Sequence, residues 1–497
     1  MGYGFVIDQR KCIGCHACTV ACKAENDVPL GDFRTWVKYT EKGEFPEVRR
    51  HFTVLRCNHC DAAPCVEICP VTALHKRPDA IVDLDRDICI GCRACMQACP
   101  YDALYLNEEK GTAEKCHYCA HRTEVGLEPA CVIVCPEQAI VAGDLDDPNT
   151  RIARLVAEEP TSQRRLDKGT KPRVHYVDAL PESLEPGRAG EEAQWIWADR
   201  AQPAPELPPD YPVTKELMTT LNVDHAPAWG WHVWVYLVTK NIAAGAMMAA
   251  PFLALPAAAA TATSAWLPEV LGLGFLAATF WLLIDDLGRP ERFWRLLFAP
   301  NTRSWLVRGA WVLSAFGGLA TASLVLRLLG ADGAADLLRW IDFPVAALAS
   351  GYSAWLFGQC RGRDLWIERG LFVQLVLRAA FLGGISALFL VGDAARGSTG
   401  LITAALGAAT GIGMLLEGRR TRGHARSGGR AAAILAQAFR PETGGLLTLL
   451  AAAALAAGAY LPAVGGLLAV VGTIVALIGM LHYERTWIRA GQAVPNS

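Results

Sequence analysis

The stretch Cys89–Pro100 reads CIGCRACMQACP, and its cysteine spacing decides what half of this chain can be. Two residues separate each of the first three cysteines, three more precede the fourth, and a proline follows directly. Three other groups repeat this plan, each opening with C-x-x-C and having three residues between its third and fourth cysteines. The groups contain 16 of the 17 cysteines: Cys12, Cys15, Cys18, Cys22; Cys57, Cys60, Cys65, Cys69; Cys89, Cys92, Cys95, Cys99; Cys116, Cys119, Cys131, Cys135. The pattern indicates metal chemistry repeated four times.

Iron–sulfur chemistry explains this spacing better than zinc or disulfide bonds do. Three closely spaced thiolates can wrap three corners of one [4Fe–4S] cubane, and the proline separates the fourth thiolate for a neighbouring cluster. Zinc sites usually pair two C-x-x-C units across a longer loop. Sixteen thiolates would hold four clusters, and no group lacks a member, as a three-iron centre would require.

The second and third groups are separated by a short strand-and-turn segment, 81–83, and we predict that they form one two-cluster module. The first and fourth groups would then pair around it. Four clusters without a flavin or nucleotide signature form an electron wire, because each cubane passes one electron and leaves bond-making chemistry elsewhere. Clusters that only staple the fold are the alternative, but one cluster would usually serve that purpose.

Charge divides the 497 residues into two dissimilar parts. Residues 1–227 carry 26 Lys and Arg against 36 Asp and Glu, a net charge of −10, whereas residues 228–497 carry 21 against 13, a net charge of +8. The second part's arginines lie beside apolar runs, which argues against nucleic-acid binding. The size and the apolar second part exclude a small secreted disulfide scaffold. Residues 1–8 show no secretory or twin-arginine pattern, so we expect no export signal.

We predict three segments along the chain. An α+β, ferredoxin-like four-cluster domain covers 1–180, a linker covers 181–227, and an all-α polytopic membrane domain of about eight transmembrane helices covers 228–497. The linker contains eight prolines among many acidic residues, which favours an extended connection. Trp195 and Trp197 indicate that part of it docks on another surface.

A membrane-spanning helix needs ~20 mostly apolar residues, and eight charge-poor stretches of the chain have this length. They lie at about 229–254, 267–285, 305–328, 340–359, 369–391, 398–417, 443–461 and 463–483. A soluble helical core would show polar faces at helical spacing, which these stretches lack. We expect no haem, because bis-histidine ligation needs paired histidines within the spans, and only His232 and His482 stand near span ends.

Arginines predict the orientation of the eight spans. An even number of spans places both termini and every even-to-odd loop on one side. That side has 15 arginines, whereas the opposite side has Arg327, Arg339 and Arg396. The positive-inside rule therefore predicts a multi-pass protein of the prokaryotic inner membrane with its cluster domain in the cytoplasm.

The cysteine pattern over residues 3 to about 180 resembles the four-cluster electron-transfer subunit of polysulfide, dimethyl sulfoxide and nitrate reductases, within the molybdopterin oxidoreductase superfamily. The resemblance implies nested ligation, in which each cluster takes ligands from two groups. The implied sets are Cys12, Cys15, Cys18 and Cys135; Cys22, Cys116, Cys119 and Cys131; Cys57, Cys60, Cys65 and Cys99; and Cys69, Cys89, Cys92 and Cys95. Lys23 stands where the family usually has proline after Cys22.

The membrane half has its own resemblance, carried by LIDDLGRPERFW at 283–294 and PNTRSW at 300–305. These segments resemble the NrfD-type anchor of the polysulfide reductase family, which has about eight helices and, in this class, a quinone site without haem. Such anchors are usually separate subunits, and here one is fused to the cluster domain. The resemblance also implies a separate large catalytic subunit that carries a molybdenum or tungsten pterin cofactor.

A quinone site would lie at the cytoplasmic ends of the spans, near the closest cluster. Its candidate residues are His232, Tyr236, Lys240, Asp286 and Arg289, which can hold or donate protons or bind a quinone oxygen. The alternative is that the DLGRP segment is a salt-bridged cap between helices and that Tyr236 belongs to an aromatic belt.

Ionisable residues inside a membrane span are candidates for a functional role, because burying them in lipid is costly. Lys240 and Arg378 lie well inside spans, and we expect no acidic residue at a similar depth. Asp285, Asp286, Arg289 and Glu417 are expected to gather at the cytoplasmic ends. Cys360, outside the four groups, is expected to be a buried small apolar residue.

We therefore predict an electron-transfer and membrane-anchor subunit that connects a molybdopterin catalytic subunit to the quinone pool through four [4Fe–4S] clusters. Alone, the chain is not expected to turn over the substrate of the complex. Two alternatives stay open: the same module in a hydrogenase or thiol–disulfide reductase complex, and an ion-translocating redox module in which Lys240 and Arg378 belong to a proton path.

Overall fold

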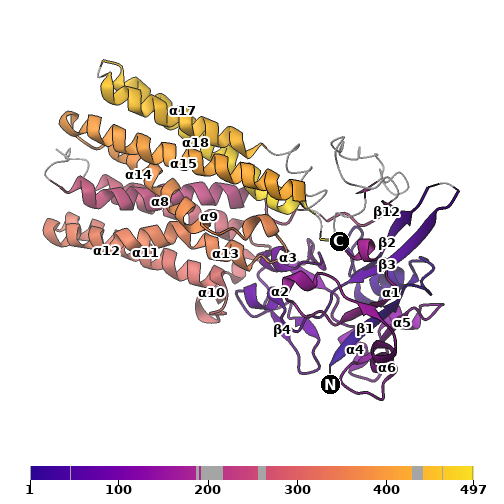
Figure 1. The fold of residues 1–497 in the computed structure, drawn as a ribbon. Helices are drawn as coiled ribbons and strands as arrows, with labels where there is room; N and C mark the ends of the chain where they lie inside the picture. The colour runs from indigo at the N-terminus through magenta and orange to yellow at the C-terminus, as the bar shows by residue number, and fades with distance from the viewer. Residues whose placement is uncertain are drawn as a thin grey trace.

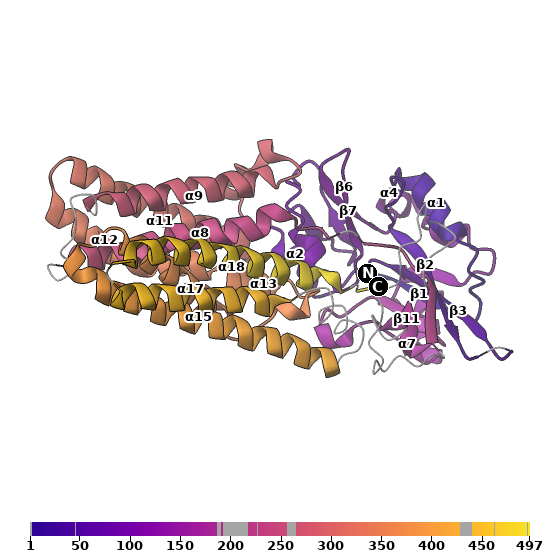
Figure 2. The same cartoon turned by 90° about the horizontal axis from the view of Figure 1, so that it is seen from above.

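A computed structural model describes residues 2–44, 46–185, 190–191, 217–225, 227–255, 265–427, 440–461, 463–494 and 496–497. They form a cysteine domain of strands and short helices, which ends at β12, and a bundle of long helices that begins at α8. The cysteine domain lies at one end of the helix bundle (Figure 1). Figure 2, seen from above, shows the same end-to-end arrangement.

Within the described residues, the strands of the cysteine domain form two four-stranded sheets and two hairpins. The first sheet has the order β8-β1-β10-β9, and its strands are β1 (Tyr3–Asp8), β8 (Ile140–Asp144), β9 (Thr161–Ser162) and β10 (Val174–Val177). The second has the order β11-β12-β2-β3, and its strands are β2 (Thr35–Lys42), β3 (Arg49–Arg56), β11 (Gly190–Glu191) and β12 (Leu217–Leu221). The hairpins pair β4 (Leu74–Lys76) with β5 (Val82–Leu84), and β6 (Leu104–Asn107) with β7 (Thr112–Lys115).

Strand β1 is apolar on both faces because both faces are covered. Phe5 and Ile7 pack into the core with Tyr176, whereas Val6 packs on the other side against Ile152 of α6. The domain's helices are short: α1 (Ala17–Asn26), α2 (Pro64–Ile68), α3 (Ala94–Ala98), α4 (Ala120–Thr123), α5 (Ala130–Ile133), α6 (Arg151–Glu158) and α7 (Pro181–Leu184).

The predicted linker contributes to the cysteine domain where the structure describes it. Strand β12 pairs antiparallel with β2, so that Met218 lies opposite Glu41, and β11 pairs parallel with β12. These parts are therefore not a free extended connection. Trp195 and Trp197 lie outside the described residues, and the boundaries of the three predicted segments stay a prediction.

The helix bundle consists of long, roughly parallel helices (Figure 1). They are α8 (Trp231–Leu253), α9 (Leu267–Asp285), α11 (Trp305–Leu328), α12 (Asp332–Gly351), α14 (Leu371–Leu388), α15 (Asp393–Ser427), α17 (Pro441–Tyr460) and α18 (Gly465–Ala493), with the short α10 (Arg295–Phe298) and α13 (Ser353–Gln359). Among the described residues, seven helices are long and apolar enough to cross a membrane. Large apolar side chains such as Trp281 and Leu467 stay exposed on their outer faces, as expected of a surface that meets lipid.

The predicted span 340–359 does not correspond to one of those seven helices. Its residues are divided between α12 and α13, with a break at Tyr352, and α12 contains four charged residues, among them Arg339 and Asp342. Both charged side chains are buried inside the bundle. Three of the four charged residues of α12 lie before residue 340, so the predicted span itself contains only Asp342, and α12 still runs alongside α11.

Small residues let the central helices approach closely. A Cβ atom added to Gly245 of α8 would lie 2.2 Å from the Ala379 carbonyl oxygen of α14, and one on Gly383 would lie 2.2 Å from the carbonyl oxygen of Gly245. Neither position can therefore carry a side chain without moving these two helices apart.

The two domains share one hydrophobic core. Ile90 and Ala98 from the cysteine domain cluster with Trp229, Phe357 and Trp366 from the bundle. Trp229 stacks on Trp366 with ring centroids 5.4 Å apart. The junction thus resembles the interior of a single protein more than a surface contact.

Loops from one end of the bundle form this junction, together with the C-terminus. The Arg363 guanidinium donates to the side-chain oxygen of Gln97 at 2.8 Å, and the Asn496 N–H donates to the Asp102 carboxylate at 2.6 Å. The segment around Arg289 docks at the same end. The predicted grouping of these loops on one side of the bundle agrees with this arrangement.

Candidate functional site

In every cysteine group, the residue before the second cysteine adopts the left-handed backbone conformation. These residues are Gly14 with φ 70°, His59 with φ 43°, Gly91 with φ 70° and Tyr118 with φ 63°. Glycine adopts this conformation freely, whereas the other two carry strain of about 1–3 kcal/mol each. Tyr118 is held in place because its buried hydroxyl donates to the Gly4 carbonyl at 2.7 Å. The same tight turn therefore forms at all four C-x-x-C segments.

The exits from the last three groups also repeat. Three residues after the fourth cysteine, Thr72, Asp102 and Gln138 have φ values of 56°, 49° and 50°. The intervening proline fixes its own φ and has no N–H to donate. The sequence indicated this exit through the proline, but nothing local indicated the non-glycine left-handed residues.

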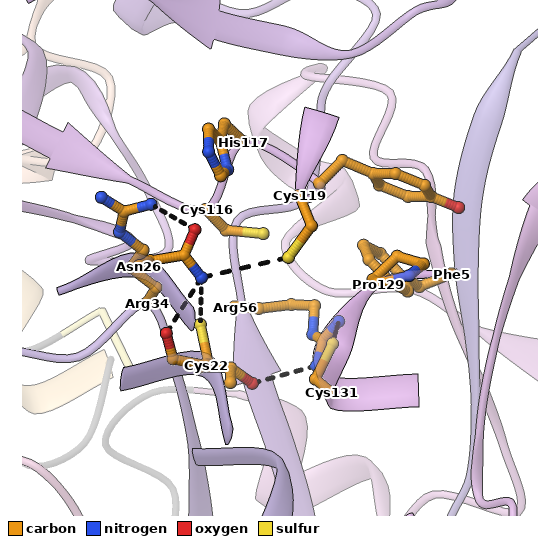
Figure 3. Close-up of a pocket in the computed structure, with 12 residues that line it drawn as sticks. Phe5, Cys22, Asn26, Arg34, Arg56, Cys116, His117, Cys119, Pro129 and Cys131 are labelled. Atoms are coloured by element: carbon orange, nitrogen blue, oxygen red, sulfur yellow. Dashed lines mark hydrogen bonds between the residues drawn. The ribbon is translucent and has the colours of Figure 1, made fainter. Parts of the chain in front are cut away.

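Four cysteines from two distant groups line a single pocket (Figure 3). Cys22 from α1 and Cys131 from α5 face Cys116 and Cys119 across it. This is the nested set implied for one cluster, assembled from the first and fourth groups. Among the described residues, no three His, Cys, Asp or Glu side chains converge closely enough to hold a single metal ion; these thiols line a cavity instead.

Polar groups around this pocket point at the sulfur atoms. The Asn26 amide lies 3.7 Å from the Cys22 sulfur and 3.9 Å from the Cys119 sulfur, and the buried Arg56 donates to the Cys131 sulfur at 3.4 Å. Burial raises the pKa of the Cys131 thiol, and Arg56 opposes that rise only in part. Ligand thiols must be deprotonated to bind metal, so the pocket fits a group that brings its own positive charge, as iron does.

The remaining cysteines gather in sets that match the other implied clusters. Cys65 lies within electrostatic range of Cys57, Cys60 and Cys99; Cys95 of Cys69, Cys89 and Cys92; and Cys12 of Cys15 and Cys135. The assignment of individual cysteines as cluster ligands stays a prediction.

Neighbouring sets lie within electrostatic range of one another at specific pairs of thiols. These pairs are Cys18 with Cys131, Cys57 with Cys116, and Cys65 with Cys95. The sets therefore follow one another in a single file. One end of the file is the set with the solvent-exposed Cys15, and the other end is the set with Cys69, Cys89, Cys92 and Cys95.

The last of these sets lies directly against the helix bundle. The Trp229 indole donates to the Cys92 carbonyl at 3.3 Å, and the Asn301 amide donates to the Cys69 carbonyl at 2.7 Å. Arg93, the residue after Cys92, forms a 3.2 Å ion pair with Asp286 of the bundle.

The structure brings two of the five candidate quinone residues together. The His232 ring lies 3.3 Å from the Asp286 carboxylate through Nδ1 and 3.0 Å from that of Asp285 through Nε2. Asp286 in turn contacts Arg93. These three linked residues form a polar path between the first helix of the bundle and the cysteine domain.

Tyr236 and Lys240 lie deeper in the bundle, away from that path. The Lys240 ammonium donates to the Ser353 hydroxyl at 2.6 Å and lies 4.6 Å from the centre of the Tyr352 ring and 5.8 Å from that of Tyr236. Arg289 belongs to neither group, because its guanidinium donates to the Lys110 carbonyl of the cysteine domain.

Arg378 does have acidic partners at its depth, contrary to the expectation from the sequence. Its guanidinium donates to Glu484 at 2.8 Å and lies 3.4 Å from Glu417, which also accepts a hydrogen bond from Tyr483. Lys240 lies within electrostatic range of Glu484. Glu484 was missed because the last span was predicted to end at residue 483, whereas α18 continues to Ala493.

Two further expectations can be compared with the bundle. Glu417 pairs with Arg378 and so does not join Asp285, Asp286 and Arg289 in one group. Cys360 is fully buried, as expected of a small apolar residue.

Family comparisons match both domains. Residues 3–24 match a 4Fe–4S binding domain, residues 48–145 a 4Fe–4S dicluster domain, and residues 220–404 the family described as polysulphide reductase, NrfD. These matches cover all four cysteine groups and the helix bundle as far as the first residues of α15.

Three curated relatives resemble the cysteine domain. The iron–sulfur subunit of a putative dimethyl sulfoxide reductase from Halobacterium salinarum is 40% identical over 216 residues, which cover 37% of this chain and 81% of the relative. A tetrathionate reductase subunit from Salmonella typhimurium is 45% identical over 179 residues, 35% of this chain and 72% of the relative. A polysulfide reductase chain from Wolinella succinogenes is 39% identical over 180 residues, 35% of this chain and 93% of the relative.

Proposed function

Because this protein belongs to the family of reductase iron–sulfur subunits, with an NrfD-type membrane domain in the same polypeptide, we propose that it moves electrons between a separate catalytic subunit and membrane quinone. Four [4Fe–4S] clusters would be held by the four cysteine sets. Each bound cluster supplies a one-electron redox centre. The chain itself positions these centres in a file and provides a quinone site at the membrane end.

One observation carries this proposal: the file of cysteine sets ends beside the path from Arg93 through Asp286 to His232. A quinone headgroup bound at His232 and Asp286 would lie next to the set that contains Cys92. Quinone reduction takes up protons as well as electrons, so the site needs groups that hold a proton. Burial raises the pKa of Asp286, although Arg93 and His232 counteract part of that rise.

The opposite end of the file faces solvent and suits the catalytic partner. Cys15 is exposed there, and the apolar side chains of Ile13 and Val20 are 55% and 65% exposed. Exposed apolar side chains at this end would be covered by a bound partner. By family resemblance, the partner would carry a molybdenum or tungsten pterin cofactor.

Purification of the tagged chain from its native membranes tests the composition of the complex. Metal analysis should find about 16 iron atoms per chain, four for each cubane, and molybdenum or tungsten in a co-purified large subunit. Nickel-binding cysteines in that subunit would favour the hydrogenase alternative, and redox-active cysteines the thiol–disulfide alternative. Stoichiometric zinc in place of iron would contradict the proposal.

The quinone site is tested with the purified chain and menadione as the oxidant. Clusters reduced with dithionite should be reoxidised by menadione, and the Asp286→Asn variant should slow this reaction at least tenfold because it removes the carboxylate between Arg93 and His232. The control is Asp332→Asn, which changes an exposed carboxylate at the start of α12. Equal rates for both variants and the wild type would contradict a quinone site at Asp286.

Buried charges in the bundle favour ion translocation as a second function. Lys240, Arg378, Glu417 and Glu484 are all buried, and groups of this kind mark ion paths in membrane proteins. In liposomes, quinol-driven pH changes inside the vesicles should vanish in Lys240→Ala while electron transfer persists. Unchanged pH signals in this variant would argue against a proton path through Lys240.

We place the cysteine domain in the cytoplasm, at the inner membrane of a prokaryote. The arginine-rich loops at the junction support this orientation. A reporter fused after Ser497 should be active in the cytoplasm, and periplasmic activity would reverse the orientation.

A further inference from the structure

The segment between α9 and α11, residues 286–304, contacts the cysteine domain through both of its ends, and we call it the docking loop. It contains the DLGRP and PNTRS sequences. We propose that the docking loop is part of the binding site of the cluster at Cys69, Cys89, Cys92 and Cys95, where it holds the ligand-bearing segments in place and raises the cluster's reduction potential. This inference rests on the proposed function, because it requires that the cysteine set binds a cluster.

The second half of the docking loop forms hydrogen bonds with the backbone of the segment around Cys69. The Asn301 side-chain amide donates to the Cys69 carbonyl at 2.7 Å and to the Glu67 carbonyl at 3.3 Å, and the Asn301 backbone N–H donates to the Pro70 carbonyl at 2.8 Å. The buried Ser304 hydroxyl donates to the Ile68 carbonyl at 2.7 Å. Four consecutive carbonyls of the cysteine domain thus have their donors in the helix bundle.

The first half of the docking loop also donates hydrogen bonds to backbone carbonyls, here around Cys89. The Arg292 guanidinium donates to the Cys89 carbonyl at 2.9 Å and to the Arg86 carbonyl at 2.7 Å. The backbone N–H of Arg289 donates to the Ile90 carbonyl at 3.1 Å.

Glycines explain how the two segments come so close. A Cβ atom on Gly288 would lie 2.3 Å from the Gly111 carbonyl oxygen, and one on Gly91 would lie 2.7 Å from the Cα atom of Gly288. A side chain on Gly288 would therefore meet the turn of the β6–β7 hairpin, and one on Gly91 in the cluster-binding loop would meet Gly288, so either would push the domains apart.

The interpretation of the segment as a salt-bridged cap between helices accounts for only part of these contacts, namely the pairs of His232 of α8 with Asp285 and Asp286. The ion pair within it, Arg289 with Glu291, is 3.5 Å long and exposed. The backbone and side-chain donors of Asn301, Ser304 and Arg292 are instead directed at carbonyls of the cysteine domain. The polar groups of the docking loop serve the junction.

Hydrogen bonds and nearby positive charge tune cluster potentials. A reduced cluster carries one more negative charge than an oxidised cluster, so the Arg292 guanidinium stabilises the reduced form. The fixed donor of Asn301 keeps the Cys69 loop in its ligating position, because a buried carbonyl left without a donor favours rearrangement. The cluster site is therefore incomplete without the helix bundle.

Redox titration of the purified full-length chain, followed by electron paramagnetic resonance, tests this inference. Arg292→Gln should lower the ratio of reduced to oxidised cluster about tenfold at a fixed potential for one cluster, a shift of about 59 mV for a one-electron couple. Arg292→Lys keeps the charge and should shift that cluster less. The control is Arg396→Gln, because Arg396 pairs with Asp393 at the start of α15, outside the docking loop.

The affected cluster must be the one at Cys89. The Cys89→Ala variant should remove the same spectral signal that Arg292→Gln shifts. Asn301→Ala should shift that signal in the same direction or lower the iron content from about 16 to about 12 atoms per chain, with the other three signals unchanged.

The inference is overturned if Arg292→Gln and Asn301→Ala leave all four potentials at their wild-type values, or if they shift a signal that persists in Cys89→Ala. That result would leave the proposed function intact when the wild-type chain holds four clusters that menadione oxidises. Absence of iron from the wild-type chain would instead refute the proposed function itself.

Discussion

Replacing Glu114 with glutamine removes the negative charge from a fully buried ion pair in the cysteine domain. The Glu114 carboxylate lies 2.6 Å from the Arg34 guanidinium, and both side chains are at most 1% exposed. Tyr105 also donates to this carboxylate at 2.8 Å. Arg34 also donates a hydrogen bond to the side-chain oxygen of Asn26. The amide nitrogen of Asn26 points at the sulfur atoms in the pocket of Figure 3. The substitution therefore leaves a buried cation without its counter-charge beside a predicted cluster.

The expected cost follows from this burial. Removing one partner of a buried ion pair destabilises a protein by about 3–5 kcal/mol, because the remaining charge stays buried and uncompensated. Since about 1.4 kcal/mol corresponds to a tenfold change in an equilibrium constant, local opening of the β6–β7 hairpin should become at least about a hundred times more frequent.

Hydrogen–deuterium exchange measured by mass spectrometry on the full-length chain reports this opening directly. Peptides that cover 104–115 should exchange at least about a hundred times faster in Glu114→Gln, as the opening constant requires. Glu109→Gln, which changes an exposed residue in the turn of the same hairpin, serves as the control. The double variant Arg34→Met with Glu114→Leu should recover much of the protection, because two apolar side chains leave no buried charge.

The pH dependence gives an independent check. Burial raises the pKa of Glu114, but the hydrogen bonds from Arg34 and Tyr105 outweigh it and hold the pKa below its usual value. A lowered pKa in the folded state means that the stabilisation is complete above the ordinary glutamate pKa of about 4.3 and is lost as the pH falls below it. The advantage of the wild type over Glu114→Gln should therefore be constant near neutral pH and shrink in acid.

Three results would refute this reasoning. Glu114→Gln could exchange no faster than Glu109→Gln, the double variant could be as unprotected as the single variant, or the advantage of the wild type could grow as the pH falls. Each result would mean that the Arg34 charge is compensated by something other than Glu114.

Other substitutions test the remaining features. Asn26→Ala removes the amide that faces the sulfur atoms in Figure 3 and should lower the potential of one cluster in a redox titration, because hydrogen bonds to sulfur favour the reduced state; an unchanged set of potentials would exclude this role. Glu484→Gln removes one of the two carboxylates beside Arg378 and should lower the free energy of unfolding of the detergent-solubilised chain by about 3–5 kcal/mol. The control Asp393→Asn changes an exposed ion pair and should alter the free energy of unfolding by less than about 1 kcal/mol. Gly245→Leu forces α8 away from α14 and should cost at least the ~1–3 kcal/mol typical of overpacking; wild-type stability in this variant would show that the helices can separate freely.

The sequence by itself determined the chemistry and the division of the chain, because both are written in local spacing. The spacing of the cysteines indicates iron–sulfur clusters, and long apolar stretches indicate membrane spans. Neither pattern depends on which residues lie nearby in the folded protein. Strands and short helices followed by long apolar helices were therefore predictable. Local reasoning failed where a residue's partner lay elsewhere, as at the end of α18, where Glu484 lies one residue beyond the predicted span 463–483.

Only the tertiary structure decided which groups meet. Arg378 and Glu484 are 106 positions apart, and no spacing rule connects them. The DLGRP segment contains acids and arginines that suggest pairs among themselves, yet the Arg292 guanidinium donates to a carbonyl 203 positions away, beside the predicted cluster. Buried donors and charges must be satisfied by whatever the fold brings near them, and that is a property of the packed chain rather than of any short stretch of it.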